Sequence, residues 1–273
     1  MKKIKWLVLV VTLLLSVVGC SNKEKIVIGT MAQPGEPILK YVEKKFEEKT
    51  GYDLVIKIFT EFATPNNALA AGEIQANLFQ HQPFLDTYNQ TNQTDLVAAC
   101  IMYDCAYGGY TKKDITTLDE IPEGKTITIA NDASNMKRCL DLLQQEGLIE
   151  VDYQGKDVNE LNPDNIQQYI TKNEKNLVIK PISTSLIASS LDDKNTYLGI
   201  VNATFAIAAG LGQKATLLCQ EEDPTHSNAN ILAIQKKDQQ ASWLLDLVEI
   251  LTSEDTDQFV KQTFGSTVTP YHG

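Results

Sequence analysis

Arginine is almost absent from this 273-residue chain: of its 24 basic residues, only Arg138 is an arginine. Positive charge at a surface can come from lysine, but binding a carboxylate through two parallel hydrogen bonds needs the planar guanidinium of arginine. The sequence alone leaves two interpretations of Arg138 open. Either it binds a carboxylate or it is an ordinary surface residue.

Motifs of catalysis and of phosphate or dinucleotide binding are absent as well. The sequence has no GxSxG nucleophile elbow, no HExxH zinc motif, no phosphate-cradling loop and no glycine-rich dinucleotide fingerprint. Its three histidines are scattered, and no two cysteines have CxxC spacing. The formal net charge of −11 argues against nucleic acid as a partner. These absences argue against an enzyme, and we expect no cofactor and no metal.

Long apolar runs are missing after the first twenty residues. Lysines at positions 2, 3 and 5 precede an apolar run over residues 6–18, which only Thr12 and Ser16 interrupt. The run is too short for a comfortable membrane span, so it predicts a signal peptide over residues 1–19. Residues 17–20, Val-Val-Gly-Cys, resemble the lipobox of bacterial lipoproteins, which implies a lipid anchor on Cys20 at the outer side of the cell membrane. The alternative is a secreted protein with an ordinary cleavage site.

Cysteine is scarce in the remaining chain. Four cysteines follow Cys20, at positions 100, 105, 139 and 219. An extracytoplasmic compartment permits disulfides, and four cysteines allow three connectivities. We expect at least one disulfide, and the pairing stays open.

The pattern of strands and helices that is present predicts an α/β fold. Residues 25–30 and 54–58 alternate as strands, and helices begin near Pro37 and Pro65. The repeated strand–helix units indicate a mostly parallel sheet. The pattern changes at Gly108 and Gly109, where we expect the chain to bend into a second lobe.

The second half continues with further strand and helix patterns. Strands are predicted at residues 126–130, 177–179, 197–201 and 231–234. Helices are predicted at residues 183–191, 203–209, 243–251 and 256–264, with one more running to residue 147 after a loop and cap at residues 131–134 and another beginning at Asn162-Pro163. We expect lobe 1 to comprise residues 25–109 plus 231–273, and lobe 2 residues 110–230. Residues 20–24 would form the anchored linker, and two segments near 106–112 and 230–236 would join the lobes.

The stretch over residues 72–85, GEIQANLFQHQPFL, contains the strongest candidate for a binding site. It predicts a short buried strand that ends in Phe79-Gln80-His81, followed by a helix that Pro83 opens. Ligands of α/β folds bind beyond the carboxyl ends of strands, so Phe79 and His81 are candidate wall residues. The alternative is a core aromatic followed by a capped helix.

Two asparagines and three further rings are weaker candidates. Asn202 ends a predicted strand and Asn230 precedes one, and each could simply cap a turn. Three aromatic residues could belong either to the core or to a pocket, namely Phe62, Tyr107 and Phe205.

Taken together, these segments resemble a known family. From residue 25 onward the chain is similar to the NlpA-type, methionine-binding lipoproteins, the substrate-capture components of ABC importers. The similar segments, in the family's order and spacing, are FTEFATPNNALAAGEIQANLFQHQPFL, GGYTKK, TIANDASNMKRCLDLLQQEGLI, IVNATFAIAAGL and ANILAIQKKD. The resemblance implies a two-lobed periplasmic-binding-protein fold (type II) with a ligand cleft between the lobes. It also implies an ABC permease and ATPase as partners.

The resemblance assigns roles by position. Arg138 would clamp the carboxylate of the ligand, while Asn202 and Asn230 would hold its α-amino and carboxyl groups. The pocket for the ligand side chain would be lined by three rings, Phe62, Phe79 and His81.

Departures from the family's pattern widen the choice of ligand. Cys105-Ala106-Tyr107 stands where the family has Glu-Pro-Met, Gln33-Pro34-Gly35 where it has Gly-Pro-His, and Gln75 where it has Asp. Methionine is our first expectation, and a related amino acid or short peptide stays open. Two further alternatives are an extracytoplasmic enzyme that reuses the fold and a surface interaction protein without transport.

Anchoring through Cys20 is directly testable. We expect Cys20→Ser to move the protein from the membrane fraction to the soluble fraction and to abolish lipid labelling, because Cys20 carries the anchor. Fractionation of cells after a salt wash measures this, with Cys100→Ser as the control that stays in the membrane fraction. Continued pelleting of Cys20→Ser with the membranes would contradict the lipoprotein interpretation.

Overall fold

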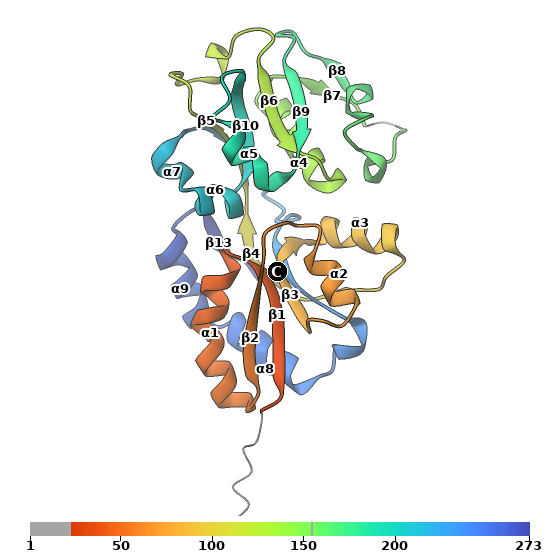
Figure 1. The fold of residues 1–273 in the computed structure, drawn as a ribbon, viewed down its shortest axis with the longest axis vertical. Helices are drawn as coiled ribbons and strands as arrows, with labels where there is room; N and C mark the ends of the chain where they lie inside the picture. Colours follow the sequence, from red (N-terminus) through yellow and green to blue (C-terminus); the bar gives the residue numbers. More distant parts are fainter. Residues whose placement is uncertain (1–22, 154) are drawn as a thin grey trace, which may run out of the picture.

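The computed structural model describes residues 23–153 and 155–273, which form two lobes stacked along the long axis of the molecule (Figure 1). The predicted signal peptide, Cys20 and the first part of the 20–24 linker lie outside the described residues. The first lobe is built on a six-stranded sheet and the second on a five-stranded sheet.

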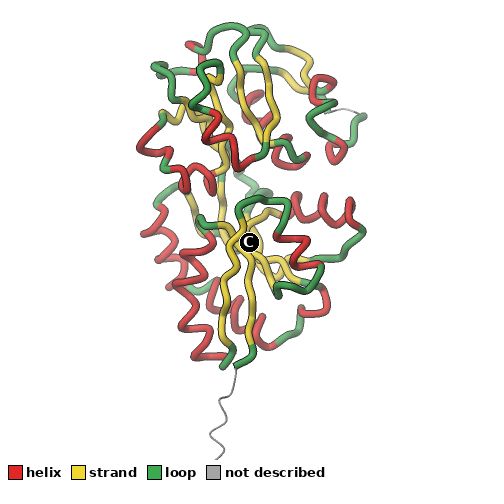
Figure 2. The backbone as a smooth tube through the Cα atoms, in the orientation of Figure 1, coloured by secondary structure: helices red, strands yellow, loops and turns green. Residues whose placement is uncertain are grey.

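The first lobe contains both ends of the described chain. Its strands are β1 (Lys25–Met31), β2 (Asp53–Phe59), β3 (Ala76–His81), β4 (Val97–Cys105), β12 (Asn230–Ile234) and β13 (Val268–Pro270). Its helices are α1 (Gly35–Thr50), α2 (Pro65–Ala70), α3 (Gln82–Asn92), α8 (Ser242–Leu251) and α9 (Glu254–Phe264), with the 3-10 turn η4 (Lys236–Asp238). The strand order is β13-β4-β12-β3-β1-β2, and helices flank the sheet on both sides (Figure 2).

The second lobe is inserted between β4 and β12. Its main sheet has the order β11-β5-β10-β6-β9, and β7 and β8 form a small separate ladder. The strands are β5 (Tyr107–Thr111), β6 (Thr126–Ala130), β7 (Glu150–Val151), β8 (Ile170–Lys172), β9 (Val178–Ile182), β10 (Thr196–Asn202) and β11 (Thr216–Gln220). The helices are α4 (Ala133–Gln145), α5 (Thr184–Ser190), α6 (Ala203–Ala209) and α7 (Leu211–Lys214), with 3-10 turns η1 (Leu118–Glu120), η2 (Val158–Glu160) and η3 (Ile166–Gln168).

Hydrophobic spacing explains why α1 forms and where it packs. Ile38, Leu39, Val42 and Phe46 are fully buried on one face of the helix, at the spacing of successive helical turns. The helix ends at Gly51, whose φ of 81° is a left-handed conformation that glycine adopts without a steric penalty. This helix therefore lies where its apolar stripe covers the first-lobe sheet.

Each lobe has its own hydrophobic core. The first-lobe core includes Phe46, Leu78 and Leu232, and the second-lobe core includes Ile129 and Leu140. Ala203, at the start of α6, reaches across and joins the core of the first lobe. Separate cores allow the lobes to move relative to each other, and α6 is a point where they pack together.

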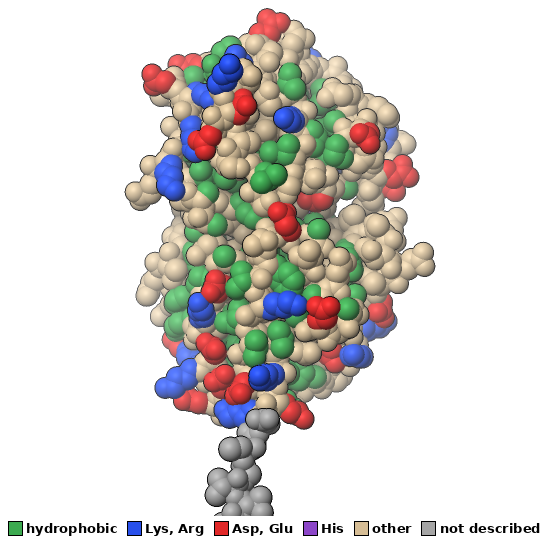
Figure 3. All heavy atoms as spheres, viewed as in Figure 1, with side chains coloured by type: hydrophobic (Ala, Val, Ile, Leu, Met, Phe, Trp, Pro, Cys, Tyr) green, Lys and Arg blue, Asp and Glu red, His purple; other side chains and the backbone are tan. Residues whose placement is uncertain are grey.

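Two short segments join the lobes. Ala106 alone separates β4 from β5, and residues 221–229 connect β11 to β12. The first crossing is the first residue of the expected segment 106–112, whose Gly108 and Gly109 lie inside β5. The second crossing lies earlier than the expected segment 230–236, because Asn230 lies inside β12. Charged and apolar side chains are interspersed over both lobes on the face in Figure 3.

Both sheets are mixed rather than mostly parallel. Strands β1, β2 and β3 pair in parallel, as do β6, β9 and β10. However, β12 pairs antiparallel with β3 and β4, and β5 pairs antiparallel with β10 and β11. The prediction of a mostly parallel sheet is wrong because the strands that carry the chain into and out of the second lobe run against their neighbours.

Two further predictions are corrected by the structure. The helix expected from Asn162-Pro163 is only the 3-10 turn η3. The expected disulfide is not formed, and the cysteines at positions 100, 105, 139 and 219 are free thiols. Burial raises the pKa of the Cys100 and Cys219 thiols to about 12, and that of Cys105 and Cys139 rises for the same reason. These cysteines serve as small apolar side chains.

Gly108 and Gly109 in β5 have to be glycine, because neighbouring atoms leave no space for a side chain. A Cβ at Gly108 would lie 2.8 Å from carbons of Leu217 and Tyr110, and one at Gly109 would overlap the sulfur of Cys219. Glycine at these positions allows β11 and the side chains of β5 to pack closely against the backbone.

This close packing predicts the effect of adding a single methyl group. We expect Gly109→Ala to lower the free energy of unfolding by about 1–3 kcal/mol, because the new methyl group overpacks a buried site. Urea denaturation measures the change. Gly212→Ala is the matched control, because nothing lies within 4 Å of the added Cβ there, and we expect a change within about 0.5 kcal/mol.

The origin of the effect can be isolated in a double-mutant cycle. Cys219→Ala removes the sulfur that a Cβ at position 109 would meet, so the cost of Gly109→Ala should shrink in that background. An equal cost in both backgrounds would contradict the steric explanation.

Candidate ligand-binding site

All six predicted site residues lie around one cavity between the lobes. Its lining consists of Phe62, Phe79, Gln80, His81, Phe84, Asn135, Arg138, Asn202 and Asn230. The free volume is about 10 Å³, which is room for about one water molecule. The sequence-based selection thus names residues that the fold brings together from five separate segments, and their contact with a ligand stays a prediction.

His81 presents a neutral ring to this cavity. It ends β3 and caps α3, where its Nδ1 accepts a hydrogen bond of 3.0 Å from the Phe84 N–H. Burial, together with the positive charge of Arg138, lowers the pKa of His81 to about 3. The neutral ring therefore carries its proton on Nε2, which is buried close to Asn135 and has no hydrogen-bond partner among residues 23–153 and 155–273. Both the capping role and the wall role considered for this residue are compatible with this position.

Four phenylalanine rings pack together across the gap between the lobes. Phe62 lies 5.6 Å from Phe79, 6.2 Å from Phe84 and 5.0 Å from Phe205, measured between ring centroids. Phe79 and Phe84 meet edge to face at 5.8 Å. Phe205 belongs to α6 of the second lobe, so this cluster closes the cavity from both sides.

The two asparagines use part of their amide groups within the fold. Asn202 caps α6 by accepting a 3.0 Å hydrogen bond from the Thr204 N–H. Asn230 donates from Nδ2 to the carbonyl oxygen of Phe79 at 2.9 Å. The capping role is therefore present for Asn202, whereas Asn230 lies inside β12 and bonds to the neighbouring strand β3. Both side chains line the cavity as well.

Arg138 is buried, and its guanidinium makes two hydrogen bonds to one carboxylate of the same chain, that of Glu221. Nε donates to Oε1 of Glu221 at 2.8 Å, and Nη2 donates to Oε2 at 2.6 Å. Nη2 also donates to the carbonyl oxygen of Cys105 at 3.1 Å, and the guanidinium lies over the Tyr107 ring at 4.8 Å. Burial disfavours the charge, but the hydrogen bonds and the charge of Glu221 outweigh it and raise the pKa of Arg138.

The start of α4 determines where Arg138 lies. Asp132 caps this helix by accepting a 3.0 Å hydrogen bond from the Asn135 N–H and a 3.1 Å bond from the Asn135 side chain. Asn135 precedes Arg138 by three residues, so both side chains lie on the same face of the helix. The cap thus fixes the first turn from which both residues reach the cavity.

Four contributors to the site were not among the predicted site residues. Gln80 lies between two of the predicted residues, Phe79 and His81. Phe84 and Asn135 are each one helical turn from a predicted residue, so the helical period could have indicated them. No periodicity could have indicated Glu221, because it is 83 residues from Arg138 in the sequence and is one of 35 acidic residues.

Polar contacts join the lobes at the edges of the cavity. Both carboxylate oxygens of Glu61 accept hydrogen bonds, from Ser183 at 2.8 Å and Ser185 at 2.6 Å. Thr87 donates to Asn159 at 3.3 Å. Glu61 and Asn159 are exposed and their hydroxyl partners are half-buried, so water has access to these contacts.

Metal-binding and membrane-spanning features were sought in residues 23–153 and 155–273. In these ranges no three His, Cys, Asp or Glu side chains are arranged to hold a metal ion. Across the same ranges, none of the helices combines the length and apolar character that crossing a bilayer requires.

The model of one protein family, described as NlpA lipoprotein, matches residues 26–272. The chain belongs to the NlpA lipoprotein family. The predicted resemblance is thereby confirmed.

The relatives and solved structures that are similar to this chain cover most of its length. A methionine-binding lipoprotein MetQ of Bacillus subtilis is 31% identical, over 92% of this chain and 89% of the relative. A nutrient-binding protein from Burkholderia cenocepacia, solved with bound methionine, has a TM-score of 0.80 at 30% identity and covers 90% of this chain and 99% of its own. A periplasmic substrate-binding protein of an ABC transporter from Coxiella burnetii has a TM-score of 0.80 at 29% identity, over 90% and 100%.

These structures establish the fold class. This NlpA-family chain has the two-lobed α/β fold of periplasmic binding proteins, as the sequence predicted.

The buried neutral His81 predicts a pH dependence of stability in this NlpA-family protein. The unfolded chain takes up a proton on this ring below a pH of about 6.5, whereas the folded ring stays neutral until about 3. Stability is therefore lost as the pH falls through this window. His81→Asn keeps a capping side chain without the titration. We expect wild type to lose about 2 kcal/mol more than His81→Asn between about pH 7 and pH 5, measured by urea denaturation.

The comparison between the two proteins cancels the other titrating groups, because both proteins contain them. Equal pH dependence of wild type and His81→Asn would show that the ring takes up its proton at the same pH in the folded and unfolded states, which would contradict the lowered pKa.

Proposed function

We propose that this protein is the substrate-binding component of an ABC importer and captures a free amino acid, methionine first, between its two lobes. The observation that carries the proposal is the meeting of Arg138, two asparagines and a set of aromatic rings around one interlobe cavity. The Burkholderia structure of the same fold, which holds methionine, and the methionine-binding name of the Bacillus relative support the choice of ligand. The protein binds and releases its ligand without chemical change.

The cavity offers complementary groups for an α-amino acid. In our proposal the carboxylate accepts from Nη1 of Arg138, which makes no hydrogen bond to the described residues. Asn202 and Asn230 supply amide groups to the carboxyl and α-amino groups. His81 contributes its Nε2–H, and the rings of Phe62 and Phe79 contact the thioether, since sulfur packs favourably against aromatic rings.

Binding requires the lobes to separate. A free volume of about 10 Å³ admits a water molecule but not an amino acid. Opening breaks the contacts of Glu61 with Ser183 and Ser185 and separates Phe62 from Phe205. The two crossing segments, at Ala106 and residues 221–229, are where the backbone would turn.

The proposed location and partners follow from the anchor. Acylation of Cys20 would tether the protein to the outer side of the cell membrane, next to an ABC permease that receives the amino acid. A matching ATPase on the opposite side would drive transport.

Arg138→Lys tests the proposed binding residue. Lysine keeps the charge, but its compact ammonium lacks the planar fork that makes two parallel bonds to Glu221 while another N–H reaches a ligand. We expect ligand affinity to fall by about 2–5 kcal/mol, measured by isothermal titration calorimetry. The neighbouring Lys137→Gln is the control and should leave affinity unchanged. A loss below about threefold for Arg138→Lys would remove this residue from the proposed site.

A thermal-shift panel tests the ligand class. We expect methionine to stabilise the protein most among the twenty amino acids, and methioninamide to stabilise it much less, because the amide cannot replace the carboxylate at Arg138. Native mass spectrometry of protein purified without denaturant adds the mass of any ligand that copurifies. Equal stabilisation by methionine and its amide would contradict the carboxylate interaction.

A further inference from the structure

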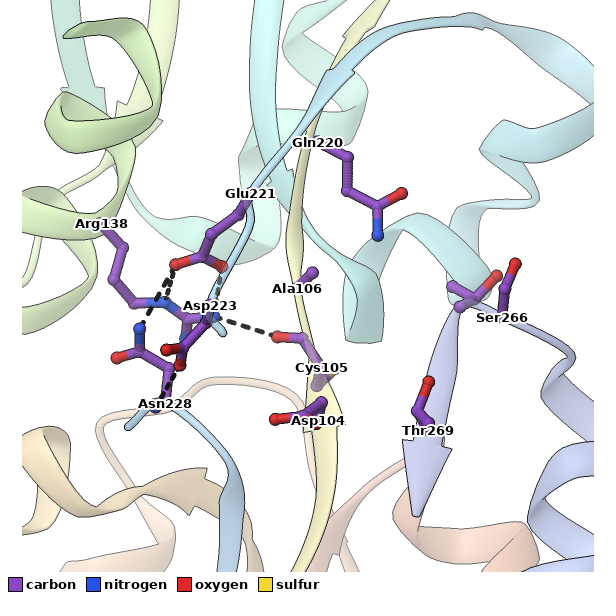
Figure 4. A pocket seen from close by; sticks show the side chains of 11 residues that line it. Asp104, Cys105, Ala106, Arg138, Gln220, Glu221, Asp223, Asn228, Ser266 and Thr269 are labelled. Carbon is purple, nitrogen blue, oxygen red and sulfur yellow. Dashed lines mark hydrogen bonds and ion pairs between the residues drawn. The ribbon is translucent and has the colours of Figure 1, made fainter. Parts of the chain in front are cut away.

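Glu221 is the residue through which the candidate site and the second crossing segment are connected. It follows β11 directly, and its side chain is only 10% exposed. Besides its two bonds to Arg138, its Oε2 accepts from the Tyr107 N–H at 3.0 Å, and its own N–H donates to the Tyr107 carbonyl at 2.8 Å. Asn228 approaches Oε1 at 3.5 Å. Figure 4 shows this carboxylate facing the guanidinium from the segment that returns to the first lobe.

The hydrogen-bond count leaves Arg138 with one free edge. A guanidinium has five N–H donors. Glu221 takes one from Nε and one from Nη2, and Cys105 takes the other from Nη2. Only the two donors of Nη1 remain without a partner among the described residues, so a carboxylate ligand cannot use the two-pronged edge.

The guanidinium also separates two cavities. On one side is the small cavity lined by the predicted site residues. On the other side is a polar cavity of about 170 Å³, whose lining includes Asp104, Glu221 and Asp223. Arg138 lines both. A ligand in the small cavity would therefore meet the guanidinium of Arg138, whose positive charge is already balanced by Glu221 on the side of the larger cavity.

The surrounding charges do not restore a positive potential. Among the described residues that line the small cavity, Arg138 is the one cationic side chain, because His81 is neutral. On the Glu221 side, Asp104 lies 2.6 Å from His226, and Asp223 accepts from the backbone N–H of Asn228 at 2.7 Å. Within the described part of the chain, the residues that line the two cavities thus hold no surplus cation for a ligand that is only an anion.

We propose that Glu221 is a specificity-determining residue that selects a ligand whose own charges cancel. A zwitterionic α-amino acid brings an ammonium with its carboxylate, so the compensated Arg138 suffices for it. A carboxylate without the ammonium adds an unbalanced negative charge near Glu221, where low polarity strengthens repulsion. This inference rests on the proposed amino-acid-binding function and states which charge class the site admits.

The experiment compares methionine with desaminomethionine, which keeps the carboxylate and thioether but lacks the ammonium group. Calorimetry on the mature chain gives the ratio of the two Kd values. We expect wild type to prefer methionine by at least about tenfold, and Glu221→Gln to lower this preference at least about tenfold, because the freed charge of Arg138 then accepts a lone carboxylate.

Two variants separate charge from geometry. Glu221→Asp keeps the carboxylate but shortens it, so its preference should stay within about threefold of wild type even where both affinities fall. Glu222→Gln removes an exposed neighbouring carboxylate and should leave both Kd values unchanged. A purely structural role of Glu221 would weaken both ligands equally in Glu221→Gln and leave their ratio unchanged.

The outcomes distinguish this inference from the proposed function. An unchanged ratio in Glu221→Gln, with methionine still bound by wild type, overturns the inference alone. Wild type that binds none of the twenty amino acids overturns the proposed function and the inference with it. Should Glu221→Gln not fold by circular dichroism, wild type still decides: binding desaminomethionine as tightly as methionine overturns charge selection.

Discussion

The buried ion pair between Arg138 and Glu221 is the interaction on which the arrangement of the site depends. It joins α4 of the second lobe to both crossing segments, through the Cys105 carbonyl and the Tyr107 N–H. Removing one partner of such a pair leaves an uncompensated buried charge, at a cost of about 3–5 kcal/mol. The pair therefore holds the guanidinium in one orientation, and the direction of its free edge follows from that.

Local patterns predicted much of the fold. The helix over Ala203–Ala209, closed by Gly210, and the strand ending at His81 lie where the sequence places them, because their signals are contained in neighbouring residues. Non-local packing explains the errors. Gly108 and Gly109 have the composition of a bend, yet the need for space next to Cys219 and Leu217 places them inside a strand. A disulfide depends on how sheets and helices meet, which cysteine spacing does not encode.

Only those site residues could be predicted that a strand end, the helical period or the family resemblance indicates. Phe79 and His81 lie at a strand end, which is where ligands bind in α/β folds. Arg138 was noticed as the one arginine, and Asn202 and Asn230 as residues at strand ends, but their ligand-binding roles came only from family resemblance. The structure brings all three to one cavity. Glu221 could not be found in this way, because its role follows from a contact across 83 residues of chain.

Because little free volume remains among the aromatic rings, the contacts of these rings with one another would compete with ligand binding. Phe62 packs on Phe79, Phe84 and Phe205 over the same surfaces that a ligand side chain would cover. If the proposed ligand binds here, it and the ring cluster would exclude each other, and the apparent affinity would equal the intrinsic affinity scaled by the open fraction. The concentration at which the proposed ligand is captured would then depend on how well the rings fit one another. A substitution of Phe205 would change this concentration without changing any proposed polar contact to the ligand.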